Sequence, residues 1–183
     1  MSAGSSNLET AELIPIDKNV GQVILQDELQ KLVTGRSDCP AIREIEAWTK
    51  KVIQEALAGK YGDNWEIKGL PKQIYKRAKG ESDERNYDNI AAGVDAAGTI
   101  TVWDCVTLRE CKEIVTVGGH WTELFEDLLT RPEEVKIAGG KAAKTKWIET
   151  VESLQNKLSK PSYSVTTAEF EFIKSVYLWT TSA

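Results

Sequence analysis

The sequence predicts an all-α fold, a helical bundle of about six or seven helices with at most one short extended segment. Apolar residues recur at three- and four-residue steps along most of the chain, which is the spacing of one helical face. Residues that cap or break helices stand between these runs. The one stretch typical of a strand, from Thr99 to Trp103, has no evident partner strand, so we expect it to be short or merely extended.

The chain is predicted to consist of an N-terminal extension, residues 1–38, and one helical domain, residues 39–183. In the extension, the apolar residues between Asn19 and Val33 lie roughly on one face of an amphipathic helix, which Gly35 ends. In the domain, Pro40 opens the clearest amphipathic helix, and Gly59 ends it. The apolar face of this helix carries Ile42, Ile45, Trp48, Val52, Ile53, Ala56 and Leu57.

The rest of the domain is predicted to be helical between clear breaks. Capping-box patterns at Thr107–Glu110 and at Thr166–Glu169 predict the starts of two helices. Other helices are expected over residues 65–79, entered through Leu70-Pro71, over residues 120–130, and over residues 144–160, where Pro161 ends the last one. The charged segment from Gly80 to Asp88 is expected to be a loop.

The composition excludes several classes of protein. Of 183 residues, 41% are hydrophobic and 28% are charged, which is ordinary for a globular domain. No stretch approaches the roughly 20 apolar residues of a membrane span, and the first six residues lack the features of a secretory signal. The cysteines Cys39, Cys105 and Cys111 are an odd number without C-x-x-C spacing, which favours buried thiols in a reducing compartment. We therefore expect a cytoplasmic protein with no membrane partner.

Charge is distributed unevenly along the chain. The net charge is −5, yet the segment from Lys136 to Lys160 holds six lysines and two acidic residues, Glu149 and Glu152. The segment is therefore +4 and the remainder −9. The acidic whole argues against a general nucleic-acid coat protein, while the basic segment is compatible with a confined RNA contact. The alternative interpretation of the basic segment is a solvated helix face.

The sequence offers few residues for catalysis or metal binding. His120 is the one histidine, which is too few for a zinc site, and it is expected to start a helix or to be satisfied in the core. The segment from Ala138 to Thr145 superficially resembles a phosphate loop, but Ala143 replaces the required glycine and no strand precedes it. The six tryptophans mostly fall on apolar stripes and are predicted to pack in the core. We expect no metal and no cofactor.

Two parts of the sequence resemble bacterial domains of the HEPN superfamily. Residues 42–79 contain the helix, the YG-x-x-W turn and the LP-x-x-I helix that open such domains. Residues 147–161, WIETVESLQNKLSKP, resemble the closing helix that runs into the motif R-N-x-x-x-H-P, and residues 166–179 supply the threonine-capped last helix. The resemblance implies an all-α fold that forms homodimers. It also implies a prokaryotic role in phage defence or toxin–antitoxin biology.

The sequence departs from the family where the chemistry occurs. HEPN ribonucleases use the Arg and the His of the motif to drive attack of the RNA 2′-hydroxyl without a metal. The matching positions hold Gln155 and Lys160, and Asn156 is retained between them. Glutamine carries no charge to stabilise an oxyanion, and a lysine base would need burial to lower its pKa by several units. We therefore expect no catalytic residue in the motif.

Three hypotheses follow for the function. The first is a catalytically silent, dimerising HEPN-like module that binds RNA or a protein through polar residues at the end of the closing helix. These residues are Gln155, Asn156, Lys157, Ser159 and Lys160. The second is an active, metal-independent HEPN endoribonuclease in which Lys160 or a residue outside the motif acts. The third is a purely structural interaction domain, in which the same five residues merely cap a helix C-terminus.

Overall fold

The computed structural model describes residues 39–94, 99–160 and 162–182, and these residues form helices and contain no β-strand. The all-α prediction is confirmed. In chain order the helices are α2 (Pro40–Tyr61), α3 (Trp65–Gly69), α4 (Lys72–Ala91), α5 (Leu108–Thr116), α6 (Glu126–Leu129), α7 (Gly140–Lys144), α8 (Lys146–Leu158) and α9 (Thr167–Ser182). Four single turns connect them: η1 (Gly62–Asn64), η3 (Trp103–Cys105) and η5 (Pro132–Glu134), which are 3₁₀-helical, and η4 (Trp121–Phe125), which is π-helical.

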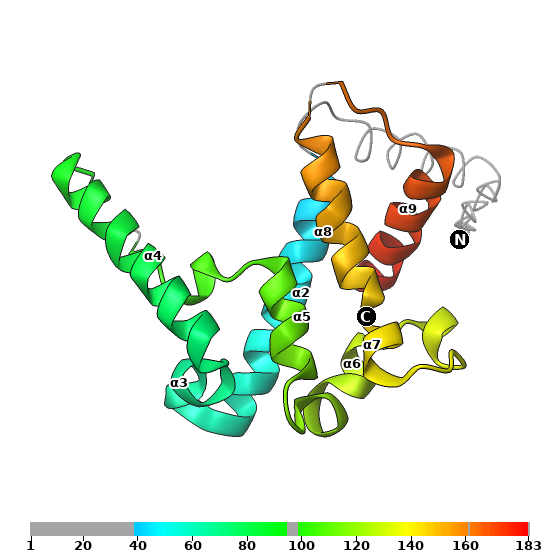
Figure 1. Cartoon of the computed structure of the whole chain (residues 1–183), viewed down its shortest axis with the longest axis horizontal. Coiled ribbons are helices and arrows are strands. Elements are labelled where there is room, and N and C mark those ends of the chain that lie inside the picture. Colours follow the sequence, from blue (N-terminus) through cyan, green and yellow to red (C-terminus); the bar gives the residue numbers. More distant parts are fainter. Residues whose placement is uncertain (1–38, 95–98, 161, 183) are drawn as a thin grey trace, which may run out of the picture.

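Helix α2 is the central element of the bundle. It packs against α9, α3 and α5, and α5 in turn packs against α8 (Figure 1). Pro40 occupies the first turn of α2, where its missing N–H costs no helical hydrogen bond. Along α2, Ile42, Ile45, Ile53 and Leu57 are fully buried on the face that the periodicity predicted. These side chains hold the layer of α5, α8 and α9 in place.

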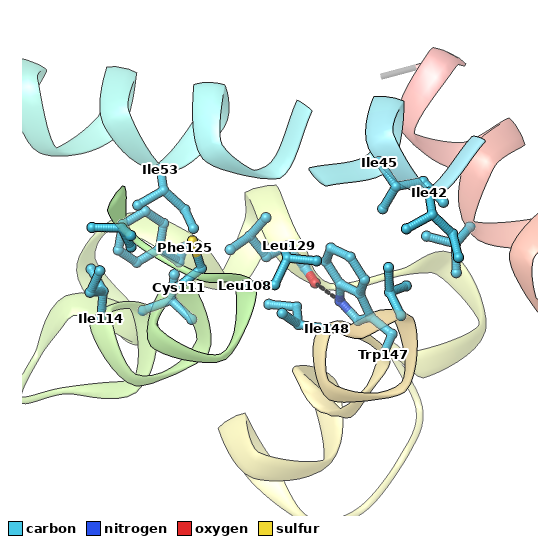
Figure 2. Close-up of a cluster of buried hydrophobic side chains, with 14 of the residues drawn as sticks. Ile42, Ile45, Ile53, Leu108, Cys111, Ile114, Phe125, Leu129, Trp147 and Ile148 are labelled. Carbon is cyan, nitrogen blue, oxygen red and sulfur yellow. Dashed lines mark hydrogen bonds between the residues drawn. The ribbon is translucent and has the colours of Figure 1, made fainter. Parts of the chain in front are cut away.

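The core is built around aromatic and branched side chains from four parts of the chain. Figure 2 shows Trp147 of α8 between Ile42, Ile45 and Leu129, with its indole N–H donating to the Leu129 carbonyl at 3.1 Å. The ring of Trp147 meets the Trp179 ring edge-on at 5.3 Å between centroids. All six tryptophans are buried or packed partly buried against the core, so the prediction of core packing is confirmed.

Residues 80–88 are helical, and the prediction of a loop was wrong. Helix α4 runs without a break from Lys72 to Ala91, and Figure 1 shows its outer half projecting from the bundle. Salt bridges at i,i+4 spacing link Arg77 to Glu81, Lys79 to Asp83, and Arg85 to Glu81. The charged side chains that suggested a loop therefore form ion pairs that stabilise a solvent-exposed helix.

Residues 99–101, where the sequence favoured a strand, form neither a strand nor a helix. The Asn86 side-chain amide accepts from the Ile100 N–H at 2.9 Å and donates to the Ile100 carbonyl at 2.8 Å. The Ser82 hydroxyl donates to the same carbonyl at 2.9 Å. Side chains of α4 thus satisfy the backbone groups that a partner strand would have paired.

The predicted helix over residues 65–79 is divided in two. Leu70 adopts an extended conformation before Pro71, which separates the short α3 from α4. Both capping boxes close as predicted: Thr107 accepts from the Glu110 N–H at 3.3 Å, and Thr166 accepts from the Glu169 N–H at 3.3 Å.

The remaining predictions concern the thiols, membrane spans and two segments that the structure does not cover. The three cysteines are free and buried, as predicted. Among the described helices none is both long and apolar enough to span a membrane. The helix predicted over residues 19–33 and the helix-ending Pro161 lie outside the described residues.

Replacing Trp147 tests the importance of this core. Because the side chain is 1% exposed, Trp147→Ala should lower the free energy of unfolding by about 3–5 kcal/mol. Trp147→Phe, which keeps a ring but loses the hydrogen bond to Leu129, should cost less. Urea unfolding followed by far-UV circular dichroism measures both. The exposed neighbour Lys146→Ala is the control, and an equal effect of W147A and K146A would contradict the packing described.

Candidate functional site

The five predicted site residues lie together on the last turn of α8 and just beyond it. The opposite face of α8 buries Trp147, Ile148, Val151 and Leu154, which turns the polar positions of the helix toward solvent. The helix ends where the Ser159 N–H donates to the Gln155 carbonyl at 3.1 Å, and the Ser159 hydroxyl donates to the Asn156 carbonyl at 2.8 Å. Ser159 therefore serves the helix end, as the capping interpretation predicts.

Gln155 connects α8 to the central helix. Its side-chain N–H₂ donates to a carboxylate oxygen of Glu46 on α2 at 3.0 Å, and Gln155 is half-buried there. The Gln155 amide is thus engaged by a neighbouring acid. It brings no positive charge into this part of the surface.

Lys157 is held by the turn that leads into α9. Its ammonium forms an ion pair with Glu169 at 3.0 Å and lies 5.7 Å from the centre of the Tyr163 ring. The hydrogen bond to Glu169 raises the pKa of Lys157. The same cluster lowers the pKa of Glu169 to about 2, through the Tyr163 hydroxyl first and then the Thr166 amide and Lys157. Lys157 therefore stabilises the α8–α9 connection as well as lining the site.

Asn156, Lys157 and Lys160 line a cleft of about 340 Å³ between α5 and α8, here called the α5–α8 cleft. Its other walls are Arg109, Glu149, Glu152 and Ser153. Glu149 is neutralised by an ion pair with Lys112 on α5. Lys157 is likewise paired with Glu169, so Arg109 and Lys160 are the cations that line this cleft outside the ion pairs found among the described residues, and Glu152 opposes their charge.

A second cleft, of about 270 Å³, adjoins the first and shares Asn156 and Glu152 with it. We call it the acidic cleft because Glu46, Glu81, Asp104 and Glu152 line it together with one cation, Arg85. Burial raises the pKa of Glu152, Arg109 opposes this shift, and Glu149, Glu110 and Glu46 add to it. The end of α8 thus separates a partly cationic cleft from an acidic one.

Arg109, Glu46 and Glu152 are site residues that the sequence analysis missed. In the sequence, Arg109 stands out only as part of the capping box that starts α5, and Glu46 only as a polar position of α2. Glu152 was counted only as one of the two acids of the basic segment. Glu152 could have been found from the helical spacing, because it lies three and four residues before Gln155 and Asn156 on α8, whereas Arg109 and Glu46 come from α5 and α2 and no sequence spacing relates them to the site.

The six lysines of residues 136–160 do not form one basic face. Lys144 pairs with Glu126 at 2.7 Å, Lys141 donates to the Thr116 carbonyl, and Lys157 is bound to Glu169. Lys136 precedes α7, and Lys160 follows the far end of α8. The basic segment is therefore divided between two separate parts of the surface.

His120 is far in the chain from α8 and is satisfied in the core, as predicted. Its Nδ1 lies 3.0 Å from the Ile114 carbonyl, which can only accept, so Nδ1 carries the proton. Its Nε2 then accepts from the Tyr61 hydroxyl at 3.0 Å. His120 lines a different cleft, between α2 and the turn before η4, and is not among the residues at the end of α8.

The segment that superficially resembles a phosphate loop contains the short helix α7. Among the described residues, no group of three or more His, Cys, Asp or Glu side chains is placed to hold a metal ion. Comparisons with protein-family models, with curated proteins and with solved structures give no significant match for this chain.

The Glu169 cluster predicts a pH dependence of stability. Because folding lowers the pKa of Glu169 from its ordinary 4.5 to about 2, its contribution to stability is present above about pH 4.5 and is lost as the pH falls toward 2. We expect Glu169→Gln to lower stability at pH 7 and to flatten its decline between pH 4.5 and 2. Urea unfolding at a series of pH values measures this. An equally steep decline in E169Q and the unaltered chain would contradict the assignment.

Proposed function

We propose that this chain is a catalytically silent HEPN-like module that dimerises and binds RNA or a protein partner through the end of α8. The observation that carries the proposal is the Gln155–Glu46 hydrogen bond together with the exposed Lys160, at the two positions where HEPN ribonucleases have Arg and His. The family assignment itself rests on the sequence resemblance. The prokaryotic defence or toxin–antitoxin setting follows from that resemblance alone.

The arrangement of the closing helices supports the family assignment. In the resemblance, an apolar helix runs into the motif and a threonine-capped helix follows. Here α8 buries its apolar face, ends beside residues 155–160, and is followed by α9 with its closed Thr166–Glu169 capping box. Both helices pack within one core and against each other.

The surroundings of the motif argue against cleavage. Attack of a 2′-hydroxyl at neutral pH needs a group that gains and loses a proton near that pH, and histidine does this most readily. The described residues hold one histidine, His120, which both Tyr61 and Ile114 engage. Lys160 is exposed and lacks the burial that a lysine base requires. The active-endoribonuclease hypothesis therefore has no base to act at the motif.

The two clefts favour different partners. The positive charges of Arg109 and Lys160 are suited to phosphate groups, which supports a confined RNA contact in the α5–α8 cleft. The acidic cleft would repel phosphates and suits a basic protein segment. This second observation supports a purely protein-binding role as the alternative function.

Restoring the lost residues tests the proposal. We expect the double substitution Gln155→Arg plus Lys160→His to cleave labelled single-stranded RNA in the presence of EDTA, at least about 10²-fold faster than the unaltered chain. The new arginine would meet Glu46, so the site can accept its charge. The control is Gln155→Arg plus Lys146→His, which makes the same two chemical changes but puts the histidine at the other end of α8.

Cleavage by the unaltered chain at a rate comparable to the double variant would contradict the silent-site proposal. If neither the unaltered chain nor the double variant cleaves the RNA, the ribonuclease-like site loses its support, and the protein-binding role becomes the better account.

RNA binding separates the two partner classes. We expect the unaltered chain to bind a fluorescently labelled single-stranded RNA, and Arg109→Ala plus Lys160→Ala to weaken this binding by about tenfold or more at low salt. Fluorescence anisotropy across a range of salt concentrations measures it, with Lys146→Ala as the control on the same helix. Binding that is absent, or that is equally weakened by K146A, would favour the protein-binding alternative.

A further inference from the structure

The outer half of α4 carries an apolar stripe that the bundle leaves uncovered. The buried residues of α4 are Ile74, Ala78 and Ser82, so none follows the middle of the helix at Ser82, and Figure 1 shows the outer half standing away from the other helices. Tyr87 and Ile90 lie three residues apart on the helix and so share one side, and Val94 follows three residues after the helix ends at Ala91. They are 72%, 71% and 56% exposed.

Acidic residues border this stripe. Glu84 lies one turn before Tyr87, and Asp88 lies next to it. Neither takes part in an ion pair among the described residues. By contrast, Asp83 is paired with Lys79, and Glu81 is paired with Arg77 and Arg85. We call Glu84, Tyr87, Asp88, Ile90 and Val94 the α4 tip. It combines an exposed apolar stripe with uncompensated negative charge.

A second exposed apolar patch lies between α6 and α7. Val135 and Ile137, 61% and 47% exposed, flank the exposed Lys136, which forms no ion pair within the part of the chain that the structure describes. Two backbone hydrogen bonds stabilise this turn: the Ile137 N–H donates to the Glu134 carbonyl at 3.0 Å, and the Glu134 N–H donates to the Arg131 carbonyl at 2.8 Å. We call Val135, Lys136 and Ile137 the α6–α7 corner.

Arg131 holds this corner rigidly against α9. Its guanidinium is buried, donates to the Ser175 hydroxyl at 2.8 Å and lies 5.6 Å from the centre of the Phe172 ring. The corner is thus a preformed surface, which lowers the entropy lost when a partner binds it.

The α4 tip and the α6–α7 corner are complementary. The α4 tip has apolar side chains beside carboxylates, and the α6–α7 corner has apolar side chains beside a lysine. The outer end of α4 and the segment between α6 and α7 lie at opposite ends of the molecule in Figure 1. A single copy therefore cannot bring its own tip to its own corner, but a second copy can.

We propose that copies of this chain associate head to tail, with the α4 tip of one copy docked on the α6–α7 corner of the next. Pairing of two tips is disfavoured, because it would bring Glu84 and Asp88 of two copies together as like charges. A head-to-tail contact between opposite ends leaves a free tip and a free corner after each addition until a ring closes, so the mass of the assembly grows with concentration. This inference does not depend on the function of the α8 end.

Variants that disable one surface at a time test the proposal. The tip variant is Tyr87→Ser plus Ile90→Ser, and the corner variant is Val135→Ser plus Ile137→Ser; all four side chains are exposed, so the fold should be retained. Sedimentation velocity over a wide concentration range should show the mass of the full unaltered chain increasing with concentration, and a constant mass for each variant alone. A mixture of the two variants should associate, because one supplies the corner and the other the tip. The control is Ile67→Ser, which removes an exposed apolar side chain on α3, away from both surfaces, and it should behave as the unaltered chain.

Charge exchange identifies the contact itself. Asp88→Lys or Lys136→Glu alone should weaken association by about tenfold at low salt, and the two together should restore it to within about threefold. A mass that stays constant in the unaltered chain would overturn the proposal. If the tip variant loses association while the corner variant still associates, the proposal is overturned in favour of paired tips. If the charge exchange does not restore association, the assigned contact is overturned.

Discussion

Burial of one face of α2 is the constraint on which the rest of the structure depends. The fully buried Ile42, Ile45, Ile53 and Leu57 bring α5, α8 and α9 to one helix, and no metal or disulfide is needed in a core of this size. Polar groups at the margins of α2 then position the neighbouring segments. Glu46 accepts from the Gln155 amide, Tyr61 donates to His120 Nε2, and Lys50 donates to the Val106 carbonyl at 2.9 Å. The candidate site at the end of α8 is therefore fixed in place by the central helix.

The parts of the fold that sequence patterns predict well are those decided locally. Apolar periodicity located α2 and α8, and the two capping boxes located the starts of α5 and α9. The prediction failed at residues 80–88 because ion pairs rather than apolar burial stabilise that half of α4. At Ile100 the hydrogen-bond partner is the side chain of Asn86, fourteen residues earlier, which no strand pattern can indicate.

The candidate site shows the same division. The five residues at the end of α8 are neighbours in sequence, so their clustering could be predicted. Their surroundings could be predicted only in part, because Glu152 lies one turn earlier on the same helix, whereas Arg109 and Glu46 reach the site from α5 and α2 through the packing of the core. These surroundings decide the chemistry: Arg109 and Lys160 line the cleft on one side of Asn156, Glu46, Glu81 and Asp104 line the cleft on the other, and Glu152 lines both. A silent binding surface accounts for this arrangement better than a cleavage site does.

The most direct measurement of the central claim is the fate of RNA incubated with the unaltered chain in EDTA, followed by analysis of the ends of the products. Attack by a 2′-hydroxyl leaves a 2′,3′-cyclic phosphate on the 5′ fragment, so even slow cleavage of this kind has a chemical signature. The account predicts intact RNA and no cyclic phosphate above the level in a protein-free control. Cyclic-phosphate ends that appear with the unaltered chain and disappear with Lys160→Ala would contradict it.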